Sequence, residues 1–268
     1  MRLNSAIGLA LLAVFFAAAL LGALYTPHDP VTPDIVNRLQ PPSAAHWFGT
    51  DQFGRDVLSR VLVGASASFV ISAASVVAAI TAGVLVGAAV GFFGGWPDRI
   101  SMAIMDALMA FPSLLLALAL IAVIGPSKYG VVAALACAYT PAVVRVVRGT
   151  VLSLREKEFV EASHALGNAP LYTLVRHVIP NCIGPVTVIA TSLFATALLS
   201  ESALSFLGLG VPPPAPTWGG MLADAKQFLS SATWLALFPG LAISFVLLGI
   251  NMAGDALRDR FDPRMSSL

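Results

Sequence analysis

Charged residues are scarce in this chain of 268 residues. They make up 11% of the sequence, whereas hydrophobic residues make up 57%. Soluble domains contain roughly 25% charged residues, so the composition indicates a membrane protein. The formal net charge is +1, and Lys and Arg form no dense cluster. Phosphate binding needs such a cluster, so we expect no nucleic-acid partner.

Residues for metal binding and catalysis are also few. The two cysteines, Cys137 and Cys182, lie in or beside apolar runs, which excludes a disulfide framework and a thiolate metal site. The four histidines show no HExxH or other close ligand spacing, and the GxxxxGK[ST] phosphate loop is absent. No GxSxG elbow occurs either. We therefore expect no catalytic residue, no metal site and no cofactor in this chain. The histidines are His28, His46, His164 and His177.

Long apolar runs dominate the sequence. A membrane helix needs about 20 mostly apolar residues to cross about 30 Å of hydrocarbon, and six segments reach or approach that length. The first is predicted to be a retained helix, because its apolar run exceeds the roughly 7 to 15 residues of a signal peptide core. The expected fold class is all-α, with six transmembrane helices. The predicted spans are Ala6 to Tyr25, Phe69 to Gly91, Ser101 to Ile124, Tyr129 to Val147, Ile183 to Leu204 and Thr233 to Gly254.

Two units are expected along the chain. Residues 1–65 would form the first transmembrane helix and an outer segment, and residues 66–268 a five-helix core with a cytoplasmic loop at 155–181. Lys and Arg concentrate in cytoplasmic loops of membrane proteins. With the N-terminus inside, the cytoplasmic set is Arg2, Arg99, Arg145, Arg148, Arg155, Lys157, Arg176, Arg258, Arg260 and Arg264, and the outer set is Arg38, Arg55, Arg60, Lys128 and Lys226. Both termini are therefore predicted to be cytoplasmic.

Small residues and prolines mark places where helices contact each other or bend. Gly83, Gly87 and Gly91 form two consecutive GxxxG steps, which predicts a close contact with another helix because lipid supplies no hydrophobic drive between helices. Pro112 and Pro141 fall inside the third and fourth predicted helices. There they would free backbone carbonyls that neighbouring helices or water must satisfy.

The stretch from Arg155 to Asn181 is too charged to cross the membrane. One face of a short helix in it is predicted to be apolar and partly small, because four residues recur at i, i+3, i+4 and i+7. These are Phe159, Ala162, Ser163 and Leu166. Gly167 would supply a left-handed C-terminal cap. A second short helix would begin at Pro170, a residue favoured at the first helical position, and end at Pro180.

Two interpretations of this helix pair remain open. It could lie on the lipid surface as an interfacial element, or it could insert into a groove of another protein. The small side chains of Ala162 and Ser163 favour the groove, because they would add little affinity for lipid.

The same residues resemble the EAA loop of binding-protein-dependent ABC importer permeases. Glu161, Ala162 and Ser163, followed by Gly167 and then by Ile179 and Pro180, match its pattern, with Ser163 in place of the usual second alanine. The resemblance implies a coupling helix that docks into a cleft of a partner ATPase. The implied docking residues are Phe159, Glu161, Ala162, Ser163, Leu166 and Gly167.

Three further stretches resemble the C-type subunit of the dipeptide/oligopeptide/nickel branch of that family. They are His46 to Arg60, Ser202 to Gly220 and Asn251 to Arg264. The resemblance implies a permease of the cytoplasmic membrane, surrounded by lipid. It would work with a B-type permease as a heterodimer, with two ABC ATPase subunits that bind ATP and Mg, and with an extracytoplasmic substrate-binding protein.

The cargo implied by the resemblance is a short peptide or nickel. We favour peptide, because a nickel path would be expected to offer imidazole ligands and no predicted span contains a histidine. An ion-coupled secondary transporter is a weaker alternative. Such proteins place ionisable residues near the bilayer midplane, where this sequence has almost none.

Charges near the outer side complete the predicted sites. Asp51 with Arg55, and Asp56 with Arg60, have the i, i+4 spacing of ion pairs worth about 0.2 to 0.5 kcal/mol on an exposed helix. Glu201 lies about 27 Å along the helix from Ile183, so a solvated helix end is favoured over an outer gate. The candidates for an outer gate or a contact with the binding protein are Asp51, Arg55, Asp56 and Glu201.

Overall fold

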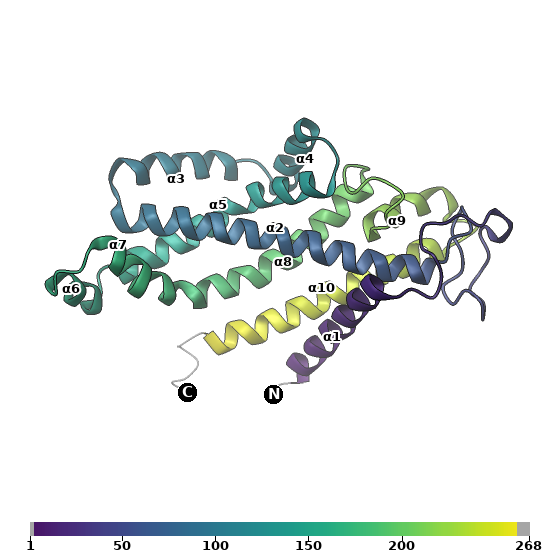
Figure 1. The fold of residues 1–268 in the computed structure, drawn as a ribbon, viewed down its shortest axis with the longest axis horizontal. Helices are drawn as coiled ribbons and strands as arrows, with labels where there is room; N and C mark the ends of the chain where they lie inside the picture. The colour runs from purple at the N-terminus through teal and green to yellow at the C-terminus, as the bar shows by residue number, and fades with distance from the viewer. Residues whose placement is uncertain (1–2, 262–268) are drawn as a thin grey trace.

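The computed structural model describes residues Leu3 to Phe261, and in this part of the chain helices joined by turns and loops are the only regular structure besides an isolated bridge between Thr50 and Asp56 (Figure 1). The long helices are α1 (Leu3–Leu24), α2 (Val57–Phe93), α5 (Lys128–Leu154), α8 (Ile183–Phe206) and α10 (Trp234–Phe261). The shorter helices are α3 (Gly95–Met109), α4 (Ser113–Ile124), α6 (Glu158–Ala165), α7 (Pro170–Thr173) and α9 (Trp218–Ala225). Arg2 and Arg264, which entered the charge count, lie outside the described residues, as does the end of the Asn251 to Arg264 motif.

Within residues 3–261, five helices are long and apolar enough to cross a membrane, and the number rises to six if α3 and α4 count as one bent span. The six predicted spans therefore correspond to real helices, but the third is not straight. Its two halves meet at an angle of 93°.

Pro112 causes this difference from the predicted third helix. The prediction placed Pro112 inside a continuous helix, whereas α3 ends at Met109 and Pro112 immediately precedes α4. Proline lacks a backbone N–H and its ring restricts the preceding residue to extended conformations, so it favours a helix start over a helix interior. Pro141, in contrast, lies inside α5 as predicted.

Helix α2 is longer than the second predicted span, Phe69 to Gly91. Helix α2 has 37 residues and begins at Val57, well before the predicted Phe69. Its first turn is capped by Asp56, whose side chain accepts a hydrogen bond from the backbone N–H of Ser59. The helix also includes the buried Arg60, a residue that hydropathy alone excludes from a span.

Helices α2 and α5 contact each other along the predicted glycine face. A Cβ atom added to Gly83 would lie 2.5 Å from the Val143 Cβ, and one added to Gly87 would lie 2.7 Å from the Val144 carbonyl oxygen. One added to Gly91 would lie 3.1 Å from the Arg148 carbonyl oxygen. The prediction of a close helix contact is confirmed, and α5 is the partner.

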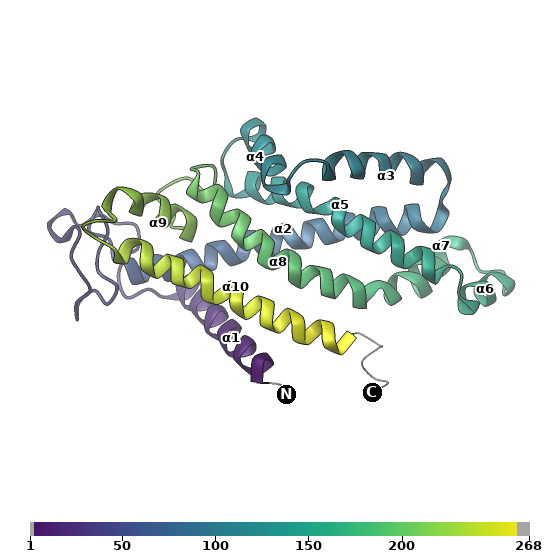
Figure 2. The ribbon, with the colours of Figure 1, turned by 180° about the vertical axis from the view of Figure 1, so that it is seen from behind.

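The two ends of the bundle carry different structures. The segment between α1 and α2 lies at one end with α9 nearby, and α6 and α7 lie at the opposite end in both views (Figures 1 and 2). Helices α2, α5, α8 and α10 run between these ends. Long, continuous helices therefore connect two structurally distinct ends.

The glycine contact can be tested with Gly87→Leu. We expect a loss of about 1 to 3 kcal/mol in the free energy of unfolding, because the new side chain must displace the Val144 backbone. Thermal unfolding in detergent would measure the change. Gly149→Ala is the matched control, because nothing lies within 4 Å of a Cβ there and alanine favours the helix by up to about 1 kcal/mol. Equal melting temperatures for Gly87→Leu and the parent would contradict the assignment.

Candidate functional site

The unit formed by α6, the turn and α7 (residues 158–173) projects at one end of the bundle (Figure 1). Helix α6 buries Val160 and Ser163, which are 2% and 4% exposed. It leaves Phe159, Ala162 and Leu166 exposed on one strip, with the spacing i, i+3 and i+7. The helix is thus held to the protein by one face and presents an apolar strip to its surroundings.

The predicted apolar face of α6 is divided by the structure. Of its four residues, Ser163 points into the protein while the other three remain exposed. Glu161 and Gly167 are exposed as well. Five of the six predicted docking residues are therefore accessible to a partner, and their docking role stays a prediction.

Gly167 forms the left-handed turn that the sequence predicts. Its φ angle is +80°. The Gly167 N–H donates to the His164 carbonyl at 2.9 Å, and the Asn168 N–H donates to the Ser163 carbonyl at 3.2 Å. This pair of bonds defines a Schellman cap. A Cβ at Gly167 would meet nothing within 4 Å, so the backbone conformation, not lack of space, favours glycine here.

The Ser163 hydroxyl links α6 to α7. Its Oγ lies 2.8 Å from the Thr173 Oγ1 and accepts a bond of 3.2 Å from the Asn168 side-chain amide. All three groups are buried or partly buried. Alanine, the usual residue of the motif that this stretch resembles, could form neither bond. Ser163 therefore fixes the angle between the two short helices.

The chain remains helical from α7 into α8, so the prediction that Pro180 ends the second short helix is wrong. A π-helical turn at Leu174–Val178 and a 3-10 turn at Ile179–Cys182 lead directly to Ile183. The Ile179 N–H donates to the Leu174 carbonyl, five residues back. These changes of helix type alter the local hydrogen bonding. The chain can therefore include Pro180, which has no backbone N–H, without ending the helix.

Arginines of α5, and Arg155 just after it, connect α5 to α3 and α2 near the α6–α7 unit. Arg148 forms two bonds with Asp98, of 2.5 and 2.7 Å, which join α5 to α3. Arg145 pairs with Asp106 at 2.6 Å. Arg155, just after α5, donates to the Gly91 carbonyl near the end of α2. The α6–α7 unit therefore follows directly from a point where α5 and α2 are joined.

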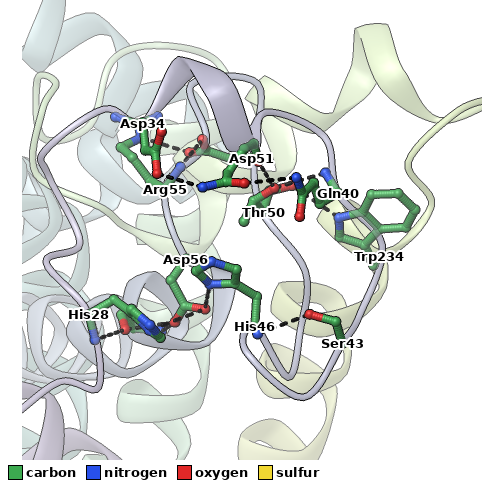
Figure 3. Close-up of polar contacts among 12 residues, drawn as sticks. His28, Asp34, Gln40, Ser43, His46, Thr50, Asp51, Arg55, Asp56 and Trp234 are labelled. Carbon is green, nitrogen blue, oxygen red and sulfur yellow. Dashed lines mark hydrogen bonds and ion pairs between the residues drawn. The ribbon is translucent and has the colours of Figure 1, made fainter.

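Asp51 and Asp56, which precede α2, are buried. The predicted Asp51–Arg55 ion pair forms, but the prediction that it lies exposed on a helix is wrong. Asp51 and Arg55 are 5% and 8% exposed and precede α2 (Figure 3). The Asp51 carboxylate accepts the N–H groups of Phe53 and Arg55 and the Arg55 Nε at 2.7 Å. The Arg60 Nε also points to Asp51, at 3.4 Å, instead of to Asp56.

Asp56 has a different set of partners. One carboxylate oxygen caps α2 through the N–H and hydroxyl of Ser59, at 2.8 and 2.7 Å. The other lies 2.9 Å from the His46 Nδ1 and 3.8 Å from the His28 Nδ1. Sequence reasoning missed this cluster because its members are far apart in the chain, and ligand spacing only detects nearby residues.

Glu201 is fully buried, so the interpretation as a solvated helix end is wrong. It accepts hydrogen bonds from Ser68 on α2 at 2.9 Å and from Ser205 at 2.8 Å. Ser202 contributes a longer bond of 3.5 Å. The carboxyl group thus joins α8 to α2 within the bundle. The role of Glu201 in an outer gate stays a prediction.

A cavity of about 430 Å³ lies beside Arg55 and Arg60. The proline-rich stretch between α8 and α9 forms one wall, and Arg55, Arg60 and Asp224 contribute charges. Of the four predicted outer residues, Arg55 borders this cavity, whereas the Glu201 side chain points between α2 and α8.

These features define a multi-pass helical membrane protein. The folded segment between α1 and α2 lies at one end, and the exposed α6–α7 unit lies at the other. The chain belongs to the family described as binding-protein-dependent transport system inner membrane component, whose model matches residues 79–267. It is therefore a component of a transport system and not a catalytic subunit.

Curated relatives span nearly the whole chain. The dipeptide transport system permease protein DppC of Alkalihalophilus pseudofirmus is 44% identical over 97% of this chain and 86% of its own length. The di/tripeptide transport system permease protein DppC of Pseudomonas aeruginosa is 40% identical over 97% and 88%. The glutathione transport system permease protein GsiD of Escherichia coli is 43% identical over 84% and 74%.

A solved structure shares the fold. A chain from inward-facing conformations of the MetNI methionine ABC transporter aligns with a TM-score of 0.58, covering 77% of this chain and 96% of that chain. The two sequences are 19% identical, so this likeness concerns the fold alone.

The role of Glu201 can be tested by Glu201→Leu and Glu201→Gln. Leucine leaves the buried hydroxyls of Ser68 and Ser205 without their acceptor, which should cost about 1 to 3 kcal/mol of unfolding free energy. Glutamine keeps an acceptor oxygen of similar size and should cost less. Thermal unfolding in detergent would compare the two variants. A leucine variant as stable as the parent would show that these hydrogen bonds do not stabilise the bundle.

Proposed function

We propose that this chain is the C-type permease subunit of an ATP-driven importer of short peptides. The observation that carries the proposal is the identity of 40 to 44% with permeases named for dipeptides, di/tripeptides and glutathione. Peptide bonds between a few residues are common to those named substrates. Nickel, the alternative cargo in the same branch, has no such support from these relatives.

The α6–α7 unit would dock into the ATPase. An exposed apolar strip of Phe159, Ala162 and Leu166 suits insertion into a protein groove, and the bonds of Ser163 hold the unit at a fixed angle. ATP and Mg would be bound by two partner ATPase subunits and not by this chain. Because the helical chain continues into α8, closure of the ATPases would move α8 as a lever.

The assembly we propose has further subunits. A B-type permease would complete the pathway as the other half of a heterodimer, and an extracytoplasmic binding protein would deliver the peptide. The cavity beside Arg55 is a suitable surface for that delivery. Asp51 and Asp56 would act by holding the outer segment in shape, since their carboxylates are buried. Glu201 would act where α2 and α8 separate on opening.

Reporter fusions test the proposed orientation. With both termini cytoplasmic, reporters after Tyr25 and within residues 210–228 should report outside, and reporters after Gly167 and Leu268 should report inside. The excess of Lys and Arg on one side is the physical reason. An inside signal from the 210–228 fusions would contradict this topology.

The docking role is tested by Ala162→Trp and Gly167→Val. The tryptophan would block insertion into the ATPase groove, and valine would strain a backbone at a φ of +80° by about 1 to 2 kcal/mol. Both variants should lose ATPase copurification and peptide uptake while remaining in the membrane. Ala162 is exposed, so the new side chain has room in the free subunit.

Ala45→Trp is the matched control for docking. It adds the same side chain to an exposed position at the opposite end and should keep ATPase copurification. If α6 instead lies on lipid, Ala162→Trp should leave ATPase copurification intact, which would reject the docking role.

Cargo is tested by uptake into vesicles that contain the reconstituted importer. We expect ATP-dependent accumulation of a labelled di- or tripeptide and none of nickel. Uptake driven by an ion gradient without ATP would reject the importer class. Nickel uptake without peptide uptake would overturn the cargo and leave the permease assignment intact.

A further inference from the structure

Two histidines and one aspartate meet in the segment between α1 and α2. The His46 Nδ1 lies 2.9 Å, and the His28 Nδ1 3.8 Å, from the same oxygen of Asp56. One ligand atom from each of the three residues lies within 4.8 Å of the other two. The imidazole rings are 4.6 Å apart between centroids. Figure 3 shows both rings directed at Asp56.

Hydrogen bonding accounts for only part of this arrangement. The His46 Nδ1 is at hydrogen-bond distance from Asp56, but 3.8 Å is too long for such a bond from His28. Ser59 occupies the other Asp56 oxygen with both its N–H and its hydroxyl, and the Ser59 Oγ accepts the His28 backbone N–H at 3.1 Å. Ser59 thus orients one free carboxylate oxygen toward both rings and also holds the His28 backbone.

We propose that His28, His46 and Asp56 form a binding site for one Zn²⁺ ion. Imidazole nitrogen and carboxylate oxygen bind zinc at about 2.0 to 2.2 Å, usually in tetrahedral geometry. Ligand atoms in such a site are about 3.3 Å apart, and the two distances to the Asp56 oxygen lie on either side of that value. Small ring rotations would complete the site.

Water would occupy the fourth position. The side chain of His28 is 45% exposed and that of His46 is 16% exposed, whereas Asp56 is 2% exposed. The site is therefore open to solvent on the histidine side and anchored in the protein at the aspartate. This combination of three protein ligands and one open position is common for zinc.

A bound ion would fasten the outer segment at three points. His28 follows α1, His46 lies in the middle of the segment, and Asp56 caps α2. Because metal ligands are brought together only on folding, the binding free energy of the ion also stabilises the folded segment. This role does not depend on the proposed cargo or on the ATPases.

The test uses the full-length chain in detergent, without a polyhistidine tag and after treatment with a chelator. Calorimetric titration with Zn²⁺ should give one equivalent per chain, and Zn²⁺ should raise the melting temperature, as ligands that bind the folded state do. His28→Ala and His46→Ala should each weaken binding by at least about tenfold, since even groups that only orient metal ligands contribute about 10- to 100-fold.

Three further variants test whether His28 and His46 act as zinc ligands. His164→Ala and His177→Ala remove histidines at the other end of the molecule and should leave Zn²⁺ affinity unchanged. His28→Cys replaces one ligand by a softer one and should retain binding while increasing the preference for Cd²⁺ over Zn²⁺.

Three results would overturn the site. They are binding well below one equivalent per chain, equal Zn²⁺ affinity in the parent and in His46→Ala, and a His28→Cys variant with no change in metal preference. None of these measurements involves transport, so failure of the site and failure of the proposed function are distinguishable.

Discussion

The close contact between α2 and α5 is the interaction on which the rest of the structure depends. Lipid provides no hydrophobic drive between helices, so their association requires close packing. Gly83, Gly87 and Gly91 allow the backbone of α2 to approach that of α5. With larger residues there, α5 could not hold the α6–α7 unit in its observed position, because only three residues separate α5 from α6.

Helix α2 also links the two ends of the molecule. Its N-terminal cap is Asp56, which takes part in the proposed zinc site, and near its other end the Gly91 carbonyl accepts a bond from Arg155, just before α6. Between these two points, in the first half of α2, Ser68 contacts the buried Glu201 of α8. Helix α2 therefore connects the segment before it, the buried Glu201 on α8 and the start of the α6–α7 unit.

Local patterns in the sequence predicted local features well. The apolar runs marked the helices, the GxxxG steps marked the contact face, and Gly167 marked the left-handed cap. Each of these features depends on residues that are close together in the sequence. The errors at Pro112 and Pro180 concern the same residue type. Proline disfavours an ordinary helix interior, but whether the chain bends, as before α4, or changes helix type, as before α8, depends on what surrounds it.

The sequence by itself determined the membrane class, the approximate spans, the small-residue contact face and the turn at the exposed helical unit, because hydropathy and backbone preference act over short distances. Only the tertiary structure decided which charges are buried. Asp51 and Glu201 are stabilised by donors that other segments of the chain bring to them. The cluster of His28, His46 and Asp56 is likewise a product of folding, since these residues meet only when the segment between α1 and α2 packs against the start of α2.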